Sequence, residues 1–343
     1  MKKYNVAVVG ANGAVGEEIL TLLSEIDFPL NKLVPLASAR SLGKTVEFNG
    51  KDLDIIELTS DVFEKENIDI ALFSAGGSVS AKFAPDAVKT GAVVIDNTSH
   101  FRMDENIPLV VPEVNPEDIA KWKQTGIIAN PNCSTIQMVQ VLKPLDDAYD
   151  LVRVDVATYQ ATSGAGKTAM EELVTQMQDF FAFKLSESEH KAFNQQIALN
   201  VIPQIDSFTE NGYTKEEMKM VNETTKIMHK NIALSATCVR VPTLRGHGEA
   251  LTLTFDSEVN ANEVREILSK APNIVIVDKP EEALYPMPAT CVDMNETFVG
   301  RIRNDNFSKN IIHMFIVADN LRVGAATNAV RIAQKWVEME GEK

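Results

Sequence analysis

The first third of the chain alternates short apolar runs with segments of helical periodicity. Residues 5–9 form a continuous apolar run typical of a buried parallel strand, and Ile19, Leu20, Leu22 and Leu23 then recur at helical spacing. Strands that alternate with helices indicate a doubly wound parallel sheet. Further strands of this sheet are predicted at residues 33–37, 68–74, 92–96 and 127–129.

The pattern changes after about residue 130. Longer gaps there separate the apolar runs, which indicates a mixed sheet. Its predicted strands are residues 152–158, 236–241, 250–255 and 311–317, with an amphipathic helix at 167–184 and loops at 186–189 and Asn211-Gly212.

The last apolar pattern is helical. Residues 325–339 carry Ala329, Ile332, Ala333 and Trp336 on one face, which has to be buried. We therefore expect this helix to return to the first domain. The predicted division is a first domain at 1–130, a catalytic domain at 131–319 and a C-terminal segment at 320–343.

Composition narrows the classes of protein. The 343 residues carry a net charge of −15, which argues against a nucleic-acid partner or an anionic membrane. Cys133, Cys238 and Cys291 are odd in number and widely spaced, so neither a disulfide framework nor a metal site is expected. No apolar run approaches 18 residues, and no signal segment precedes the first strand. We expect a soluble cytoplasmic protein.

Three glycines lie between the first strand and the first helix. Gly10, Gly13 and Gly16 permit a tight turn and a close approach of a pyrophosphate to the backbone, while the helix N-terminus supplies N–H donors. The GxxGxxG spacing is moderately specific, and a glycine turn without a ligand is the alternative.

The loop after the second strand bears on the choice of nucleotide. An NAD site places an acid there, but residues 28–46 contain none. Instead the strand is followed by Ser38, Arg40 and Ser41, whose guanidinium and hydroxyls suit a 2′-phosphate. NADP is therefore favoured over NAD, unless the loop is only a basic solvated one.

Cys133 follows a strand that stops at Asn130-Pro131 and precedes an apolar helical pattern. Ser134 and Gln137 fit a capping box, which places the cysteine at a helix N-terminus. Backbone N–H groups and the helix dipole there favour a thiolate, so we expect a nucleophile. The alternative is a small buried core residue.

Two further side chains have unusual surroundings. His247 stands between two glycines, which suits an acid/base group better than a packed core histidine. Arg240 lies in an apolar strand and needs an anion, either from a substrate or from an internal salt bridge. Glu216 and Lys219 share one helical face, where spacing alone predicts a surface ion pair.

The motifs together resemble bacterial aspartate-β-semialdehyde dehydrogenases, in order and along essentially the whole chain. They are GANGAVG, ASARSLGK, SHFRMD, NPNCSTIQ, YQATSGAG, EEMK, CVRVP with RGHGEA, and DNLRVGAA. The resemblance implies a Rossmann-type doubly wound parallel sheet plus an α+β catalytic and dimerisation domain, as in glyceraldehyde-3-phosphate dehydrogenase. It also implies a homodimer.

The activity implied is the reversible, NADPH-dependent reductive dephosphorylation of L-aspartyl-4-phosphate to L-aspartate-4-semialdehyde through a cysteine thioester. This reaction serves lysine (diaminopimelate), threonine and methionine biosynthesis. By the same resemblance Cys133 is the nucleophile, His247 the acid/base group and Gln160 the residue that orients the substrate.

The resemblance also assigns the binding residues. Arg240 holds the α-carboxylate, and Glu216 and Lys219 meet the amino group and the phosphate. Arg102 and Asn132 belong to the phosphate site. The cofactor residues are Gly10, Asn12, Gly13, Ala14, Val15, Ser38, Arg40 and Ser41, with Ser163, Gly164 and Asn320 near the nicotinamide, although glutamine can replace asparagine at the last position.

Two other functions compete with this one. An N-acetylglutamyl-phosphate reductase is similar in build, but Arg240 and Glu216 favour a substrate with free α-carboxylate and α-amino groups. A catalytically dead sensor or scaffold would need none of Cys133, His247, Gln160 and Arg240.

Overall fold

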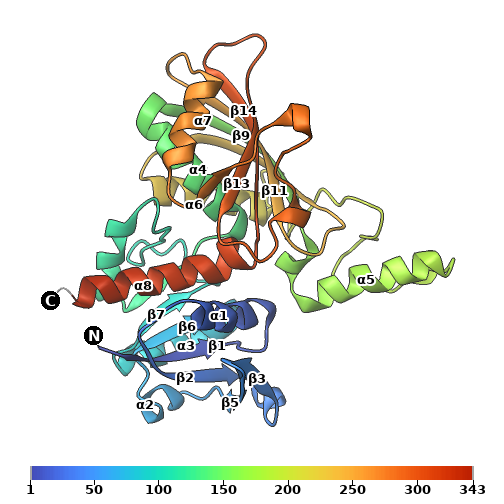
Figure 1. Ribbon diagram of the computed structural model, residues 1–343. Coiled ribbons are helices and arrows are strands. Elements are labelled where there is room, and N and C mark those ends of the chain that lie inside the picture. Colours follow the sequence, from blue (N-terminus) through green and yellow to red (C-terminus); the bar gives the residue numbers. More distant parts are fainter. Residues whose placement is uncertain (1, 342–343) are drawn as a thin grey trace. The chain divides into compact units, whose positions relative to one another are not determined.

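The computed structural model describes residues 2–341, which form two compact units. Unit 1 consists of the described residues up to Asn132 and from Ala325 onward, and unit 2 is Cys133–Gly324. These borders lie a few residues beyond the predicted ones at 130 and 320. Blue and cyan ribbons with the red helix α8 (Thr327–Gly341) belong to unit 1 in Figure 1.

Unit 1 is built on a six-stranded sheet whose strand pairs are all parallel, as the apolar runs predicted. Its central strands are buried on both faces, which explains why they read as continuous apolar runs. The order is β5 (Ile56–Glu57), β2 (Leu30–Ala37), β1 (Tyr4–Val9), β6 (Ile70–Phe73), β7 (Val93–Asp96) and β8 (Ile127–Ala129).

Helices cover this sheet, and a small hairpin adjoins it. The helices are α1 (Ala14–Glu25), α2 (Val62–Lys65), α3 (Gly77–Lys89), the 3-10 helices η1 (Ala39–Ser41) and η2 (Pro116–Gln124), and α8; the hairpin is β3 (Thr45–Phe48) with β4 (Lys51–Asp54). The hairpin carried no strong apolar signal in the sequence.

The C-terminal helix packs into the core of unit 1. The apolar face of α8 shares one cluster of buried side chains with β1 and α1. Trp336 contacts the rings of Tyr4 and Trp122 edge-on, with centroid distances of 5.8 and 5.5 Å. The helix predicted at residues 325–339 is preceded by a π-helix, η7 (Arg322–Ala326), and itself corresponds to α8.

Unit 2 contains a mixed six-stranded sheet, in agreement with the prediction. The order is β10 (Ala233–Arg240), β9 (Leu151–Gln160), β11 (His247–Phe255), β14 (Ile311–Ala318), β13 (Thr297–Asn304) and β12 (Ile274–Ile276). Alternate side chains of β9 are buried and partly exposed, so the sheet has one covered and one open face.

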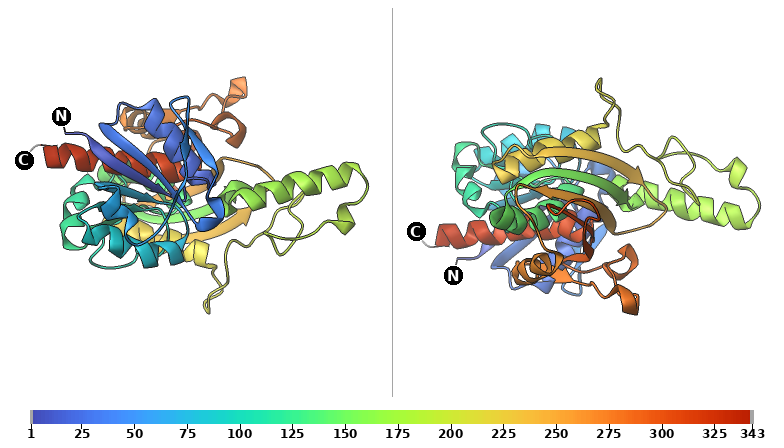
Figure 2. Two further views of the ribbon diagram at one scale, coloured as in Figure 1. Left: turned by 90° about the horizontal axis from the view of Figure 1, so that it is seen from below. Right: turned by 90° about the horizontal axis from the view of Figure 1, so that it is seen from above.

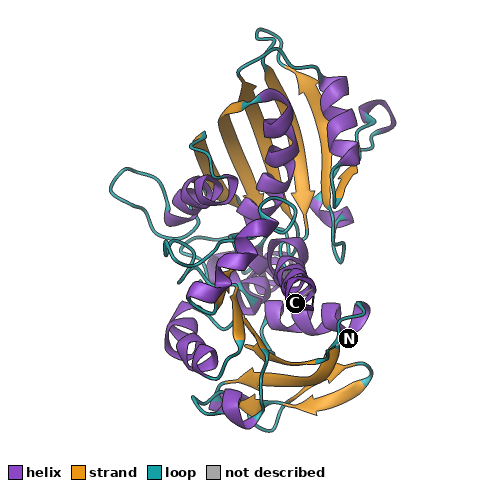
Figure 3. Cartoon of the chain, turned by 90° about the vertical axis from the view of Figure 1, so that its left-hand side faces the viewer, coloured by secondary structure: helices purple, strands orange, loops and turns teal. Residues whose placement is uncertain are grey.

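Three helices cover the inner face of this sheet: α4 (Cys133–Tyr149), α6 (Lys215–Met228) and α7 (Ala261–Lys270). Figure 3 shows them as purple ribbons against the orange strands. The helix α5 (Lys167–Phe181) instead projects away from the sheet, which both views of Figure 2 show. Short 3-10 helices complete the unit: η3 (Thr162–Ala165), η4 (Leu185–Glu187), η5 (Pro280–Glu282) and η6 (Pro288–Thr290).

Two strands of unit 2 were missed in the sequence. β12 is apolar throughout but has only three residues, and the apolar residues of β13 are interrupted by Gly300 and two arginines. A Cβ atom at Gly300 would lie 2.1 Å from the carbonyl oxygen of Val277, so the backbones approach too closely for a side chain. Only the folded sheet reveals this constraint.

Candidate active site

The glycine turn of unit 1 closes tightly over the start of α1. Gly10 has a φ of +88°, a region that glycine adopts without strain. A Cβ atom at Gly16 would lie 2.1 Å from the carbonyl oxygen of Gly10. α1 begins at Ala14 with Gly13 as its N-cap and no side-chain cap bond, so Ala14 and Val15 form an uncapped first turn. Such a turn suits an anionic ligand.

The predicted cofactor residues of unit 1 come together at the carboxyl ends of β1 and β2. The backbone N–H of Gly10 donates to Leu36 O at 2.8 Å, which fixes the turn beside β2. Asn12 Nδ2 donates to Ser41 Oγ at 2.9 Å and joins the turn to η1. Ser38 and Arg40 are exposed in the same loop.

Arg102 and Asn132, the predicted phosphate-site residues of unit 1, are both buried. Arg102 follows β7 and donates from NH2 to Asn97 O at 2.8 Å. Asn132 is the last residue before α4.

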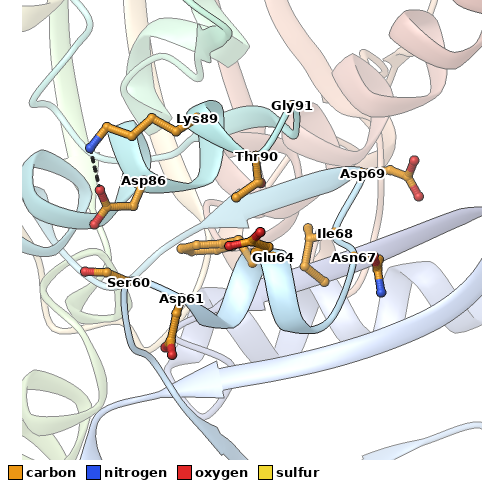
Figure 4. A pocket seen from close by; sticks show the side chains of 11 residues that line it. Ser60, Asp61, Glu64, Asn67, Ile68, Asp69, Asp86, Lys89, Thr90 and Gly91 are labelled. Atoms are coloured by element: carbon orange, nitrogen blue, oxygen red, sulfur yellow. Dashed lines mark hydrogen bonds and ion pairs between the residues drawn. The ribbon is translucent and has the colours of Figure 1, made fainter.

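A hollow of about 690 Å³ lies at the amino ends of strands β6 and β7 of the same sheet (Figure 4). Its residues include Ile68 and Asp69, just before β6, and Gly91, just before β7. Lys89 and Asp86 form an ion pair at 2.8 Å on its wall. Ligands of open α/β sheets bind beyond the carboxyl ends of strands, so this amino-end hollow is no part of the nucleotide site.

Cys133 is the first residue of α4, the helix N-terminus that the sequence predicted. It is partly exposed, whereas Cys238 and Cys291 are buried. Burial raises the pKa of Cys238 and raises that of Cys291 to about 12, so both stay thiols at neutral pH. A Cβ atom at Gly324 would lie 2.7 Å from Cys133 Cβ. Position 324 therefore has no room for a side chain beside Cys133.

The predicted capping box does not form. Because α4 already begins at Cys133, Ser134 is a helical residue of the first turn and not the N-cap. Gln137 Nε2 reaches toward His247 O, at 3.5 Å, in place of the helix start. Local spacing suggested a cap, but tertiary contacts with β11 have taken up this side chain.

His247, the first residue of β11, is completely buried. Its Nδ1 accepts a hydrogen bond from the backbone N–H of Ala161 at 3.0 Å, so the neutral ring carries its proton on Nε2. Nε2 is buried without a hydrogen-bond partner among residues 2–341. Burial and the Arg240 cation lower the pKa of His247 to about 3. The ring is a neutral donor, and none of the described residues accepts its Nε2 proton in a hydrogen bond.

Arg240, the last residue of β10, is 5% exposed and has no ion pair within residues 2–341. The alternative prediction, an internal salt bridge of Arg240, is therefore wrong for the described residues. Its NH1 donates to Ala161 O at 2.6 Å, and burial lowers its pKa. A Cβ atom at Gly164 would lie 3.1 Å from Arg240 NH1 and 3.2 Å from His247 Nε2. Glycine thus leaves the space beside both groups open.

Glu216 and Lys219 do form the ion pair that their spacing predicted, at 3.1 Å, but Glu216 is buried. Gln160 Nε2 donates to the other oxygen of Glu216, also at 3.1 Å, and Thr158 Oγ1 donates to Gln160 Oε1 at 3.0 Å. Burial alone would lower the pKa of Lys219, but Glu216 and Asp206 raise it. Hydrogen bonds through Gln160 and Thr158 thus link the ion pair to the helix-covered face of β9.

The charges of these side chains act on one another. Arg240 interacts electrostatically with Glu216 and Cys133, and His247 with Arg240 and Glu216. Unit 2 therefore brings together residues from five elements, α4, α6, β9, β10 and β11, namely Cys133, Glu216, Gln160, Arg240 and His247.

Asn320 and Ser163 lie beside this group. Asn320 Nδ2 donates to Ser163 Oγ at 2.9 Å, and Asn320 Oδ1 accepts from the backbone N–H of Gly246 at 2.9 Å. The neighbouring Asp319, which the sequence did not single out, is fully buried and accepts from Arg245 NH2 at 2.6 Å. These bonds fix the turn that leads into His247.

Neither a metal cluster nor a membrane helix emerges within residues 2–341. No group of three or more His, Cys, Asp or Glu side chains there could hold a metal ion. No helix there is long and apolar enough to cross a membrane.

Two family models match the chain: "Semialdehyde dehydrogenase, NAD binding domain" over residues 5–122 and "Semialdehyde dehydrogenase, dimerisation domain" over residues 142–323. The chain is 63% identical over 341 residues to the aspartate-semialdehyde dehydrogenase of Campylobacter jejuni, with 99% of each chain covered.

Solved structures are similar as well. Aspartate-semialdehyde dehydrogenase II of Vibrio cholerae, in complex with ASA, has a TM-score of 0.95 at 48% identity and covers 98% of this chain and 99% of its own. The Candida albicans enzyme with NADP, at 24% identity, shares the fold with a TM-score of 0.76; the match covers 99% of this chain and 100% of that one.

The neutral state of His247 predicts a pH-dependent stability. The unfolded chain protonates this side chain below its ordinary pKa of 6.5, whereas the folded protein does so only near 3. The free energy of unfolding therefore falls as the pH drops from about 6.5 toward 3. Between about pH 7 and pH 5 the wild type should lose on the order of 2 kcal/mol more than His247→Gln. Urea unfolding at both pH values measures this difference, and equal losses would contradict it.

Proposed function

The chain belongs to the aspartate-semialdehyde dehydrogenase family, and we propose that it converts L-aspartyl-4-phosphate to L-aspartate-4-semialdehyde, reversibly and with NADPH as reductant. The observation that carries this proposal is the buried Arg240, which forms no ion pair within the described residues and lies beside the protonated Nε2 of His247. A guanidinium in that state suits a carboxylate, and the imidazole N–H suits an oxygen on which negative charge develops.

Cys133 is proposed to begin the reaction. Its sulfur attacks the acyl carbon, the bond from that carbon to the phosphate oxygen breaks, and inorganic phosphate leaves with the bonding electrons. The product is a thioester on Cys133. A thiolate is both a good nucleophile and a good leaving group, which this sequence of steps requires. The start of α4 supports the role, because backbone N–H groups there stabilise negative charge.

NADPH, when bound, supplies the hydride that reduces the thioester carbon. His247 is proposed to donate a hydrogen bond from its neutral Nε2–H to the oxyanion of the resulting thiohemiacetal; it keeps this proton, because Nδ1 carries none and its loss would leave an imidazolate. When the carbon–sulfur bond breaks, the oxyanion becomes the aldehyde carbonyl and the sulfur leaves with the bonding electrons, which restores the Cys133 thiolate. The hydrogen bond from Ala161 to Nδ1 supports this role, since it keeps the proton on Nε2.

The substrate's α-carboxylate and α-amino groups are assigned to Arg240 and to Glu216, and Gln160 orients the substrate from β9. An N-acetylated substrate has no charged amino group for Glu216 to bind, which disfavours an N-acetylglutamyl-phosphate reductase. Lys219, Arg102 and Asn132 are proposed for the phosphate. For Lys219 this is supported by the positive charge that Glu216 and Asp206 stabilise.

Unit 1 contains a nucleotide-binding domain, and NADP is the proposed cofactor. The uncapped start of α1 fits a pyrophosphate, which would lie on the N–H groups near Gly13, Ala14 and Val15. The loop at the end of β2 offers Ser38, Arg40 and Ser41 for a 2′-phosphate. Ser163, Gly164 and Asn320 of unit 2 are proposed for the nicotinamide. The pathway proposed is the biosynthesis of lysine, threonine and methionine, in the cytoplasm.

The proposal predicts turnover of aspartate semialdehyde with NADP and phosphate, followed as absorbance of NADPH. Cys133→Ser should abolish most of this activity and leave NADP affinity nearly unchanged, because a hydroxyl is far less ionised and is a poorer acyl carrier. Cys291→Ser is the matched control, since that buried thiol stays protonated. A wild type without turnover would favour a sensor or scaffold, and a fully active Cys133→Ser would contradict the thioester.

The cofactor choice is tested at Arg40. Arg40→Ala should weaken NADP binding by the loss of a charge-assisted hydrogen bond, on the order of 1.5–3 kcal/mol, and leave NAD binding unchanged. The NADP/NAD preference should narrow roughly tenfold or more. The loss should shrink at high salt because Arg40 is exposed. Lys51→Ala, which removes an exposed charge on β4, is the control. Equal losses of NADP and NAD binding in Arg40→Ala would mean that Arg40 supports the loop and does not bind the 2′-phosphate.

A homodimer through unit 2 is proposed, in keeping with the dimerisation domain that matches there. Large apolar side chains are exposed at and after the end of α5, among them Phe181 at 73% and Phe183 at 97%, and such clusters mark interaction surfaces. Light scattering at micromolar concentration should give twice the chain mass of 37.7 kDa. Phe183→Asp should lower that mass, whereas Phe307→Asp, equally exposed at 96%, should not. A monomeric wild type would contradict the proposal.

A further inference from the structure

Glu249 is a buried acid that the proposed reaction does not use. It lies on β11 two residues after His247, and both side chains therefore face the same, helix-covered side of the sheet. Glu249 is fully buried, and neither of its oxygens has a fully formed hydrogen bond within residues 2–341. The polar groups that face it are the side chains of Gln137 and Ser134.

Both of these neighbours belong to the first turns of α4, directly after Cys133. Gln137 also lies within 3.5 Å of His247 O, on the strand that carries Glu249. The acid therefore stands between the helix start that presents the nucleophile and the strand that presents the histidine. In the sheet it is flanked by Thr158 of β9 and Ile316 of β14.

We propose that Glu249 is a positioning residue that, as a neutral carboxylic acid, holds the first turn of α4 against β11. The inference rests on the proposed function, since it concerns the alignment of Cys133 with His247. Neutrality is part of the role, because a carboxylate behind the helix start would oppose a thiolate at Cys133 through like-charge repulsion.

The electrostatic surroundings support the neutral form. Burial raises the pKa of Glu249 well above its ordinary value, and only hydrogen bonding by Gln137 and Ser134 opposes this. No cation is among these influences. Two titratable side chains on the same or neighbouring strands are Cys238 of β10, a buried thiol that burial keeps protonated, and His247 of β11, which is neutral. Arg240 acts on Cys133, Glu216 and His247 instead.

The test uses two replacements of similar size in the full-length protein. Glu249→Gln keeps a neutral group with hydrogen-bonding capacity, and Glu249→Leu keeps only the volume. We expect Glu249→Gln to stay within ~3-fold of wild-type kcat, whereas Glu249→Leu should lose kcat on the order of 10- to 100-fold at little-changed KM, as expected for a misplaced reacting group. Its Tm should equal or exceed that of the wild type, because a buried acid is replaced by an apolar side chain.

A second readout needs no substrate. The rate at which iodoacetamide modifies Cys133, measured from pH 6 to pH 9, reports its thiolate, with Cys133→Ser as background for Cys238 and Cys291. Glu249→Leu should shift this profile to higher pH, because the N–H groups of the first turn lose their alignment, and Glu249→Gln should not. If the wild type reacts with iodoacetamide but shows no turnover, the proposed function fails, while these shifts still test Glu249.

Thr297→Val is the structural control. It removes the buried hydrogen bond from Thr297 Oγ1 to Gln140 Oε1, 2.7 Å long and two turns into α4, and should lower Tm without moving the thiol profile. Three results would overturn the proposal: unchanged kcat and profile in Glu249→Leu, losses in Glu249→Gln as large as in Glu249→Leu, or losses that accompany a Tm below that of Thr297→Val. Should Glu249→Leu fail to fold, Gln137→Met has to lower kcat and shift the profile in the same direction.

Discussion

The backbone of Ala161 is the contact on which the arrangement of unit 2 depends. Its N–H donates to His247 Nδ1 and its carbonyl accepts from Arg240 NH1, so one buried residue orients both side chains. The following residues of η3 bind the loop before His247, through Thr162 N–H to Thr243 O at 2.9 Å and Ser163 N–H to Leu244 O at 3.1 Å. Ala161 directly follows β9, an inner strand of the sheet, and a backbone held by an inner strand is a rigid support for the two side chains proposed to act on the substrate.

Several buried polar groups of unit 2 lack hydrogen-bond or ion-pair partners among the described residues, which lowers the stability of the fold. Arg240 has no protein carboxylate, His247 Nε2 has no acceptor, and Glu249 has no complete hydrogen bond, all within the described residues. Each such group destabilises the folded state by an amount that a fully satisfied core would not incur. Under the proposed function, the substrate would supply a carboxylate for Arg240 and an oxygen acceptor for His247, which would account for two of these groups.

Unit 1 depends on a different constraint, the close approach of backbone to backbone. Gly16 packs against the carbonyl of Gly10, and the turn also bonds to Leu36. These contacts bring the first turn of α1 beside the loop that contains Ser41. The residues of unit 1 proposed to bind the nucleotide are close in sequence, and their arrangement follows from a single strand–turn–helix unit and the strand next to it.

The sequence by itself determined the features that depend on neighbouring residues. The parallel strands of unit 1, the glycine turn and the position of Cys133 at the start of α4 follow from apolar runs, glycine geometry and helix rules that act within a few residues. Where only spacing was available it misled, as for the capping box at Ser134, because a distant strand had taken the Gln137 side chain. β12 was missed because a run of three apolar residues is too short to indicate a strand by itself, and β13 because Gly300 and two arginines interrupt its apolar residues.

The tertiary structure alone decided which buried groups lack a partner. The tautomer of His247 depends on Ala161, and the hydrogen bond of Glu216 to the sheet depends on Gln160. Arg240 has no ion pair within residues 2–341 because no carboxylate of that part of the chain comes close enough to its guanidinium. These residues are far apart in the sequence, and hydrogen bonds act only over a few ångströms. No local pattern encodes such distances; they are set when five elements of unit 2 pack around one inner face of a sheet.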